Sequence, residues 1–430
     1  MIIARWCVVV ALLVLSACVE PSAVEVEDAP SVTDGVVPCE YGRAGQYACR
    51  GLDLLAFLPL EEMGVGKLGP GLTGLHSAGV VNDLWGWTDP ATGTEWALVA
   101  HATGTSFIDL SDPGNPLYAG ILPMTEGSRA SIWRDIKVYR NHAFIVADAA
   151  WSHGMQVFDL TRLRDARDPP VTFRETARYD QVPSAHNIAI NEASGFAYIV
   201  GANGGESACL AGLHMVDIRN PSNPMYAGCF TDPATGRLVR GYTHDVQCVI
   251  YRGPDAEHRG REICFGANET HLSIVDVTDK NRPMSLAAAT YPFAAYTHQG
   301  WLDEDHEYFY LNDEADENSG VRRTRTVVWD VAELDDPVVV NEYRAQTTST
   351  DHNLYVRDDY MYQSNYTSGL RVLDISNRAY PREVLYFDTE PNLSTPDYLG
   401  AWSNYPYFES GVIAVTSMQQ GVFFLKRSPK

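Results

Sequence analysis

The chain has 430 residues, of which 45% are hydrophobic and 20% charged, so it can bury a large core and is not a disordered polypeptide. Acidic residues outnumber basic ones by 55 to 32, and a surface this acidic repels phosphate backbones, which excludes a nucleic-acid partner. The aromatic content of 11%, with 34 Gly and 24 Pro, favours strands and turns over helices.

The first segment has the pattern of an export signal. Arg5 precedes an apolar run from Val8 to Leu15, which is too short to span a bilayer. Leu15-Ser16-Ala17-Cys18 then resembles a bacterial lipobox, which implies cleavage before Cys18 and a lipid on its thiol. Ordinary signal cleavage beside an incidental cysteine is the alternative. We therefore expect residues 1–17 to be a signal peptide, and the exported chain to be anchored in the cell envelope, at the outer membrane or cell surface.

Residues 18–50 are expected to form a tether that ends in a small disulfide loop. The stretch 19–38 contains acidic residues and prolines but no basic residue, which is typical of a solvated linker. Beyond Cys7 and Cys18, the six remaining cysteines are even in number, which predicts disulfides in an exported chain. We expect nearest-neighbour pairs, namely Cys39–Cys49, Cys209–Cys229 and Cys248–Cys264. A zinc site is the alternative, but the chain has no C-x-x-C pair.

A short phrase recurs along the rest of the chain: two apolar residues, an aspartate and another apolar residue. A proline-containing turn follows most copies. An aspartate in this position can accept a hydrogen bond from the backbone two residues later and fix the turn, so we interpret these residues as structural. They are Asp109, Asp159, Asp217, Asp276, Asp330 and Asp374.

Four short apolar runs, separated by turn residues, accompany each phrase. This is the size of one blade of a β-propeller, and no long segment has helical periodicity, which excludes a (β/α)8 barrel and a doubly wound sheet. We predict an all-β fold over residues 51–430, a seven-bladed β-propeller with four-stranded blades. The run Leu52–Leu60 is expected to complete the seventh blade and close the ring. The blades are predicted to begin near Val81, Trp133, Ala185, Thr243, Thr297, Asp351 and Ala401.

The repeated phrase resembles the LVIVD repeat. Further stretches, among them NDLWGWTDP at 82–90 and THDVQCVIYRGP at 243–254, are similar to the choice-of-anchor B family of bacterial surface proteins. The resemblance covers roughly residues 50–426. It implies a propeller fold and a surface location, with the lipid on Cys18 as the anchor, but it implies no activity and no substrate.

Four histidines occupy one phase of the repeat: His186, His244, His298 and His352. Each stands at the start of the strand expected to line the central channel, so the four imidazoles should meet at the channel mouth. Imidazole combined with nearby carboxylates suits one transition metal, zinc, iron, manganese or copper. A hydrogen-bonded ring without metal is the alternative, because repeats reuse residues.

The loops and strand starts around these histidines should form a binding surface. We expect a small ligand, a glycan or a peptide to bind there. The candidate ligand-binding residues are Arg134, Asp135, Asp148, His153, Asn187, Asp245, Asn353 and Asn365. The acidic stretch 312–318 is a weaker candidate for calcium, but it lacks the residue order of an EF-hand loop and is interpreted as a solvated loop.

Three classes of function remain open. The first is a non-catalytic binding module on the cell envelope, with a histidine-rich channel mouth. The second is a metal-dependent enzyme, a hydrolase or an oxidoreductase, in which the four histidines hold the metal. Its candidate acid and base residues are Asp135, Glu269 and Glu314. The chain has no G-x-S-x-G, H-E-x-x-H or P-loop motif, so no other catalytic chemistry is indicated. A purely structural scaffold is a third possibility.

Overall fold

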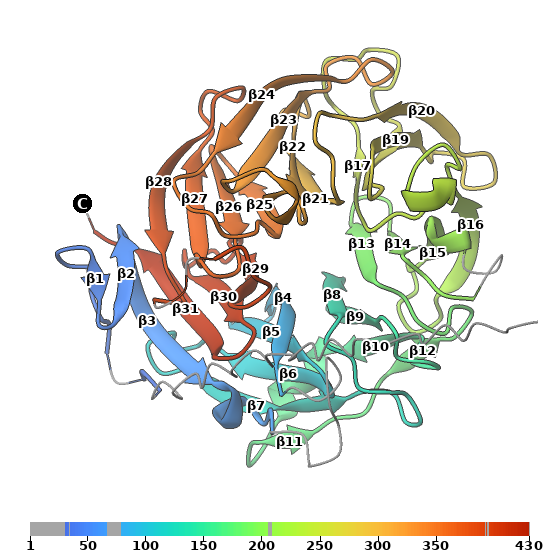
Figure 1. The fold of residues 1–430 in the computed structure, drawn as a ribbon. Helices are drawn as coiled ribbons and strands as arrows, with labels where there is room; N and C mark the ends of the chain where they lie inside the picture. Colours follow the sequence, from blue (N-terminus) through green and yellow to red (C-terminus); the bar gives the residue numbers. More distant parts are fainter. Residues whose placement is uncertain are drawn as a thin grey trace, which may run out of the picture.

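The computed structural model describes residues 31–429, apart from residues 34, 67–78, 205–208, 392 and 394. The expected signal peptide at 1–17 and the expected lipid site at Cys18 lie outside the described residues. Within them, seven antiparallel blades surround a central channel (Figure 1). The predicted seven-bladed propeller is confirmed.

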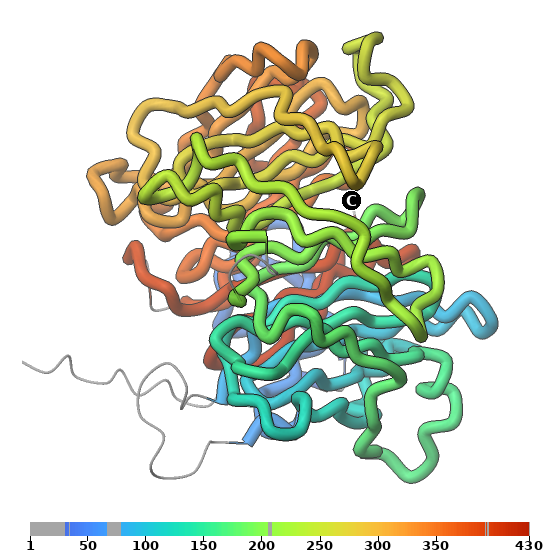
Figure 2. Tube along the Cα trace, turned by 90° about the vertical axis from the view of Figure 1, so that its right-hand side faces the viewer, coloured from blue at the N-terminus to red at the C-terminus, as the bar shows by residue number. Residues whose placement is uncertain are grey.

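Each blade has four antiparallel strands, and the first strand of each of the first six blades is the innermost. Blades 1 to 3 comprise β4 (Val81–Thr88), β5 (Glu95–His101), β6 (Gly104–Asp109) and β7 (Leu117–Pro123); β8 (Arg134–Tyr139), β9 (His142–Ala147), β10 (Met155–Asp159) and β12 (Ala177–Tyr179); and β13 (Asn187–Asn191), β14 (Phe196–Val200), β15 (Leu213–Asp217) and β16 (Met225–Phe230). Turned by 90°, the trace shows that blades which follow one another in sequence are also neighbours in space (Figure 2).

The other blades repeat this plan. Blades 4 to 6 comprise β17 (Asp245–Ile250), β18 (Glu262–Ala267), β19 (Leu272–Asp276) and β20 (Met284–Ala289); β21 (Thr297–Leu302), β22 (Tyr308–Asp313), β23 (Arg325–Asp330) and β24 (Val338–Arg344); and β25 (Asn353–Arg357), β26 (Tyr360–Ser364), β27 (Leu370–Asp374) and β28 (Arg382–Phe387). Blade 7 comprises β29 (Ala401–Tyr405), β30 (Ile413–Ser417), β31 (Gly421–Arg427) and β3 (Leu52–Pro59).

Few elements lie outside the blades. A hairpin of β1 (Arg43–Ala44) and β2 (Tyr47–Arg50) extends blade 6 by pairing with β28, and β11 (Val171–Thr172) pairs in parallel with β7. The described helices are short 3-10 turns, η1 (Leu60–Met63), η2 (Leu160–Asp165), η4 (Arg237–Val239) and η5 (Glu317–Ser319). In the described part of the chain, no helix has the length and apolar character needed to cross a membrane.

The repeated aspartates close the turn after the third strand of their blades. In all six, one carboxylate oxygen accepts a hydrogen bond from the amide two residues later, at 2.7 to 3.0 Å. This bond replaces a backbone partner at the point where the strand ends. The structural role predicted for these aspartates is confirmed.

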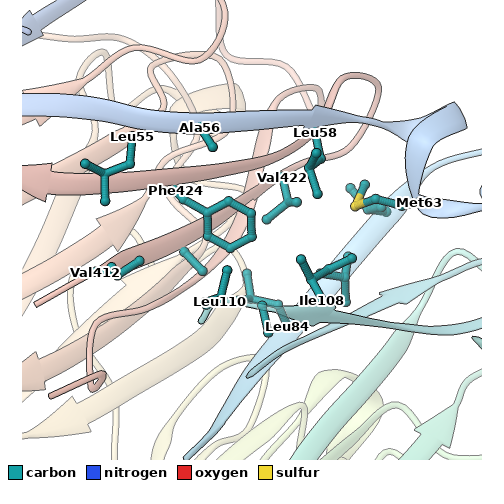
Figure 3. Packing of buried hydrophobic residues seen from close by; sticks show 14 of the residues in the cluster. Leu55, Ala56, Leu58, Met63, Leu84, Ile108, Leu110, Val412, Val422 and Phe424 are labelled. Carbon is teal, nitrogen blue, oxygen red and sulfur yellow. The ribbon is translucent and has the colours of Figure 1, made fainter. Parts of the chain in front are cut away.

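The ring is closed by a strand from the N-terminal part of the chain. β3 pairs antiparallel with β31, with Leu54 opposite Leu425, and becomes the outer strand of blade 7. Phe424 of β31 lies at the centre of the contact between blade 7 and blade 1, near Leu55 of β3 and Leu110 (Figure 3). The predicted closure by Leu52–Leu60 is therefore confirmed, and β3 covers the edge of β31 that would otherwise be unpaired.

All three predicted disulfides form. Cys39 bonds to Cys49, Cys209 to Cys229 and Cys248 to Cys264. Disulfides persist in oxidising compartments, so the three bonds indicate an exported, non-cytoplasmic protein. The third disulfide joins directly opposed residues of β17 and β18.

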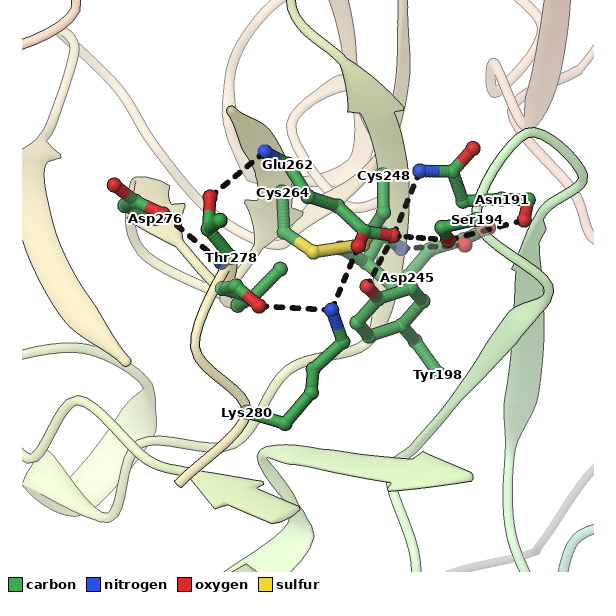
Figure 4. Close-up of a disulfide and its surroundings, with 12 residues drawn as sticks. Asn191, Ser194, Tyr198, Asp245, Cys248, Glu262, Cys264, Asp276, Thr278 and Lys280 are labelled. Atoms are coloured by element: carbon green, nitrogen blue, oxygen red, sulfur yellow. Dashed lines mark hydrogen bonds and ion pairs between the residues drawn. A yellow bond between two sulfur atoms is a disulfide. The ribbon is translucent and has the colours of Figure 1, made fainter. Parts of the chain in front are cut away.

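A buried polar network joins blades 3 and 4 beside this disulfide (Figure 4). One carboxylate oxygen of Glu262 accepts hydrogen bonds from Asn191, Ser194 and Tyr198, at 2.5 to 2.7 Å. The other oxygen is 2.6 Å from Nζ of Lys280. A buried carboxylate is stable only when its oxygens are satisfied, so this pattern fixes the relative position of the two blades.

Candidate functional site

Three positions at or near the start of each inner strand define three layers along the channel. The histidine positions stand at the head of the strands, the next residue forms a second layer, and the residue three positions after the histidine forms a third. Because side chains alternate along a strand, the second and third layers lie on the same, channel-facing side. The layers differ sharply in chemistry.

The four histidines form a continuous arc at the head of the channel. Ring centroids are 4.3 Å apart for His186 and His244, 4.1 Å for His244 and His298, and 4.4 Å for His298 and His352. Trp402 of blade 7 continues the arc at 4.6 Å from His352. The predicted gathering of the four imidazoles is therefore seen in the structure.

A β-bulge accounts for the direction of some of these rings. The pairing of β21 with β22 shifts register between Thr297 and Gln299, which leaves His298 out of the regular ladder. β29 shifts register in the same way around Trp402. A bulge of this kind re-aims a side chain, so it lets the head residue face the channel together with its successor.

Hydrogen bonds from the next blade set the tautomer of two rings. Nδ1 of His244 donates to the carbonyl oxygen of His298 at 2.8 Å, and Nδ1 of His352 donates to that of Trp402 at 2.6 Å. A carbonyl oxygen only accepts, so Nδ1 carries the proton in both rings. In the neutral imidazoles, Nε2 consequently presents a lone pair.

The electrostatic surroundings set His186 apart from the other three imidazoles. Burial lowers the pKa of His352 to about 3 and holds the pKa values of His244 and His298 well below the usual range. Burial also disfavours the charged form of His186, but Asp148, 3.0 Å from its Nδ1, outweighs burial and raises its pKa. The head of the channel therefore carries three uncharged imidazoles, those of His244, His298 and His352.

Glu314 joins this arc from the loop after β22. Its Oε2 lies 3.6 Å from Nε2 of His298, and its Oε1 lies 3.7 Å from Nε2 of His352. Tyr366 donates a hydrogen bond to Oε1 at 2.7 Å. Burial raises the pKa of Glu314 to about 7. Among the described residues at the channel, His298, His352 and Glu314 are the group whose possible ligand atoms all lie within 4.8 Å of one another.

The second layer is an ion-paired constriction. Nζ of Lys137 contacts Asp135 and lies 3.2 Å from Asp83, and Asp135 also accepts from the amides of Ile136 and Ile188. Burial raises the pKa of the neighbouring Asp245 to about 7. The cavity between this layer and the imidazoles has a volume of only about 20 Å³, room for an ion or a water molecule.

The third layer opens into a cavity of about 580 Å³ at the other end of the channel. All seven residues in the third-layer phase line it: Trp85, Lys137, Ala189, Gln247, Trp301, Tyr355 and Tyr405. Lys137, Asp245 and Tyr355 line both cavities and so mark the narrow passage between them.

Aromatic rings from blades 1, 5, 6 and 7 form one wall of this wide cavity. Trp85 lies 5.7 Å from Tyr355 and 5.2 Å from Tyr405, and Trp301 lies 5.1 Å from Tyr355, all with edge-to-face geometry. Tyr407 completes the wall at 5.4 Å from Tyr405. Aliphatic side chains from blades 2, 3 and 4, such as those of Val138, Ile190 and Val249, form the opposite wall.

The predicted ligand-binding residues do not all reach the channel. Asp135, Asn187, Asp245 and Asn353 line the narrow cavity, and Asp148 holds His186 at its edge. Three others are placed elsewhere in the fold, where they line neither cavity, so their assignment to the mouth is corrected. They are Arg134, His153 and Asn365.

The three displaced residues are buried within their blades. Arg134 is 2% exposed, and its Nη2 lies 3.0 Å from Nε2 of His153. Asn365 donates to Gln363 inside blade 6. For Arg134 of β8 the cause is strand alternation, because a residue at the right height along a strand can still point into the blade. Glu269, a predicted acid or base candidate, lies at the rim, where its carboxylate accepts a hydrogen bond from the amide of Arg237 at 2.7 Å.

The acidic stretch 312–318 is a buried ion-pair network, so its interpretation as a solvated loop is wrong. Asp313 and Asp316 are fully buried. Asp316 accepts from Nε of Arg325 at 2.6 Å, and Asp313 accepts from the amides of Ala295 and Tyr296. The sequence of acidic and asparagine residues in this stretch does not show that Arg325 of the next strand pairs with Asp316.

The aromatic cavity is the feature that the sequence reasoning missed. Trp85 and Trp301 belong to its aromatic wall. Their signal was their phase, because each follows the head position of its strand by three residues, as Tyr355 and Tyr405 do. Tyr366, which orients Glu314, has no comparable repeat signal.

Comparisons with known proteins identify the repeat and the fold. The LVIVD repeat family matches residues 184–232 and 352–389, which correspond to blade 3 and blade 6. No curated protein matches the chain.

Two solved structures illustrate the similarity in fold, both at low sequence identity. The β-propeller domain of Cps50 (Swd1) from Myceliophteria thermophila has a TM-score of 0.51 and 11% identity, covering 81% of this chain and 98% of that chain. A functionally unknown protein from Desulfotomaculum acetoxidans has a TM-score of 0.47 and 14% identity, covering 76% and 92%. Such likeness concerns the fold alone. The chain is thus a seven-bladed β-propeller that carries LVIVD repeats.

Proposed function

We propose that this protein is a binding propeller of the cell envelope, attached through a lipid on Cys18, whose ligand occupies the wide aromatic cavity. The similarity to the choice-of-anchor B family and the acidic tether support the attachment. One observation carries the binding function: the cavity at the aromatic end has a volume of about 580 Å³, against about 20 Å³ beside the imidazoles. Ligand pockets for small molecules span roughly 300 to 1,000 Å³.

The lining favours a small ligand over a glycan or a peptide. A sugar needs several free polar partners, but the amide of Gln299 is already bonded at both ends to the backbone of Leu354. The amide of Asn191 is likewise held by Glu262 and Ala193. These two amides are therefore not free to bind a sugar, whereas the rings of Trp85, Trp301 and Tyr355 remain available to a ligand.

The charges favour an organic cation. Lys137 is neutralised by Asp83 and Asp135, whereas Asp245 has no ion-pair partner among the described residues. Aromatic faces attract ammonium groups, and a carboxylate at the floor adds a direct counter-ion. Glu192 adds negative charge to the lining, while Glu304 lies 3.7 Å from the guanidinium of Arg252, which also lines the cavity. We infer that a small ammonium compound with an apolar body binds here.

The test is titration of the full chain with choline, tetramethylammonium and phenethylamine, followed by calorimetry and tryptophan fluorescence. The uncharged isostere of choline, 3,3-dimethylbutan-1-ol, is the chemical control. We expect the ammonium compounds to bind, Trp301→Leu and Asp245→Asn to weaken them, and Trp151→Leu, which removes a 66% exposed ring outside the cavity, to leave binding unchanged. Equal binding of choline and its isostere would refute the proposal that the ligand is a cation. Binding that is unchanged in Trp301→Leu would refute the proposal that the ligand occupies the wide cavity.

A metal-dependent enzyme is the second candidate, and the grouping of His298, His352 and Glu314 favours it. The small volume beside these residues gives a substrate little space, which is why binding is the preferred function. A metal-dependent hydrolase or oxidase activity that disappears in His298→Ala would reverse this preference.

A further inference from the structure

We propose that His298, His352 and Glu314 bind one divalent first-row transition metal ion at the head of the channel. This site lies across the Lys137 constriction from the aromatic cavity, so it is independent of the ligand proposed above. It also differs from a four-histidine site, because a carboxylate replaces two of the imidazoles.

Distances between the donor atoms carry the proposal. The separations of 3.6 Å and 3.7 Å from Glu314 oxygens to Nε2 of His298 and His352 are too long for hydrogen bonds. Two donor atoms that each lie about 2.1 Å from one ion, at a tetrahedral angle, are about 3.4 Å apart. Each histidine nitrogen therefore lies close to ligand spacing from one Glu314 oxygen, and the three side chains offer ligand atoms within 4.8 Å of one another.

The surroundings prepare these donors for a metal. Nδ1 of His352 donates to the carbonyl oxygen of Trp402, which leaves the lone pair on Nε2. Metal-bound histidines usually donate their other ring N–H to such a partner. Tyr366 performs the same orienting role for Glu314, through the 2.7 Å hydrogen bond to Oε1.

Glu314 also has no lysine or arginine beside it in the described part of the chain. Its side chain is 19% exposed, and neither of these residue types forms an ion pair with it. A divalent ion between Glu314, His298 and His352 would supply the missing cationic partner.

The donor set selects the class of metal. Two imidazole nitrogens and a carboxylate suit zinc, iron(II), manganese or cobalt, whereas calcium requires a shell of oxygen atoms. His244 lies 4.1 Å from His298 ring to ring, but its nitrogens are not part of the group within 4.8 Å. We therefore assign His244 and His186 to the support of the site and not to the metal itself.

The experiment uses the full chain, stripped of metal with a chelator. Zn²⁺ is titrated by calorimetry, and Co²⁺ by its visible absorption, which reports the ligand field directly. We expect one ion per chain. His298→Ala, His352→Ala and the isosteric Glu314→Gln should each lower the affinity by at least about 100-fold, and Tyr366→Phe by about 10- to 100-fold.

Matched controls separate this site from other metal contacts. His142→Ala removes a half-buried imidazole of β9 that lies outside the arc. Glu333→Gln removes one acid of the group Asp255, Glu333 and Asp335, the other possible metal-binding group in the described part of the chain. His244→Ala tests the four-histidine alternative. His142→Ala and Glu333→Gln should bind Zn²⁺ with the affinity of the unmodified chain, whereas His244→Ala should lower the affinity by much less than His298→Ala does.

Several results would overturn the assignment. Absence of binding by the stripped chain would do so, as would binding that survives Glu314→Gln and His352→Ala, or that is lost in Glu333→Gln. Circular dichroism of each variant excludes misfolding as the cause of a loss, and Glu314→Gln, which keeps shape and volume, provides the decisive comparison. Choline titration of the same variants should be unchanged, so failure at one end of the channel is distinguishable from failure at the other.

Discussion

Glu262 of blade 4 accepts a 2.6 Å hydrogen bond from the hydroxyl of Tyr198 in blade 3, while its second oxygen holds the ammonium of Lys280. Glu262 and Lys280 are both nearly inaccessible to solvent. The carboxylate thus links two blades through polar contacts, whereas most of the ring is held by apolar packing.

Glu262→Gln should therefore lower the free energy of unfolding by about 3 kcal/mol, because it leaves the buried ammonium of Lys280 without its counter-ion. Urea denaturation followed by tryptophan fluorescence measures the loss. Glu257→Gln, at an exposed position of the same blade, is the matched control and should change stability by less than about 0.5 kcal/mol. Equal stabilities of the two variants would contradict the importance of the network.

The closing strand provides a second prediction. Phe57 of β3 is 1% exposed, and its ring lies 4.5 Å from that of Phe423 in β31. Phe57→Ala should cost about 3 to 5 kcal/mol, because it removes buried apolar area and leaves a cavity at the closure. Equilibrium unfolding gives the magnitude, and size-exclusion chromatography shows whether the loosened strand edge associates with other chains. Val36→Ala, at a position 52% exposed, should leave both measurements unchanged.

The buried histidines beside Arg134 predict an acid-sensitive contribution to stability. Burial, reinforced by the positive charge of Arg134, lowers the pKa of His101 and of His153 to about 3. In the unfolded chain the value is about 6.5. The unfolded state therefore binds more protons below pH 6.5, so this contribution is present above that pH and is lost as the pH falls toward 3.

His101→Gln removes one such group. The stability difference between the unmodified chain and this variant should shrink by up to about 1.4 kcal/mol for each pH unit between pH 6 and pH 4. Urea denaturation at pH 7, 6, 5 and 4.5 measures the difference. His142→Gln, in the same pair of blades but half-buried, serves as the comparison. Parallel pH profiles for the chain and His101→Gln would contradict the prediction.

The repeated turns provide a graded test. Oδ1 of Asp330 accepts the amide of Ala332 at 2.9 Å. Asp330→Ala should cost about 1 kcal/mol, the value of one such hydrogen bond, whereas Asp330→Asn retains the acceptor and most of the stability. Thermal unfolding of both variants measures the gap. If asparagine were as damaging as alanine, the charge of the aspartate and not its turn bond would be the important property.

Much of the fold was predictable because it repeats. Regular spacing along the chain was enough to locate the repeated aspartates and the starts of the blades. The strand Leu52–Leu60 could be located because it was the apolar run left over when the blades were assigned. Nearest-neighbour cysteines paired because opposed strands such as β17 and β18 bring Cys248 and Cys264 together within one hairpin.

The site was less predictable, because spacing gives the height of a residue in the ring but not the direction of its side chain. Arg134 shares the phase of the histidines, yet it points into its own blade and meets His153. The position of Glu314 depends on a loop conformation and on Tyr366, neither of which repeats. The aromatic residues of the third layer do share a repeat position, because each follows the head of its strand by three residues.

The pairing of β3 with β31 sets the order in which the protein can be completed. The two strands of this pair stand at opposite ends of the propeller sequence. During synthesis β3 emerges before any blade exists, and its partner emerges after all the others. Until β31 has been synthesised, blade 7 cannot assemble and β3 has no partner strand. The ring can therefore close only after β31 has been synthesised. A chain that lacked β31 could not form the pair that closes the ring.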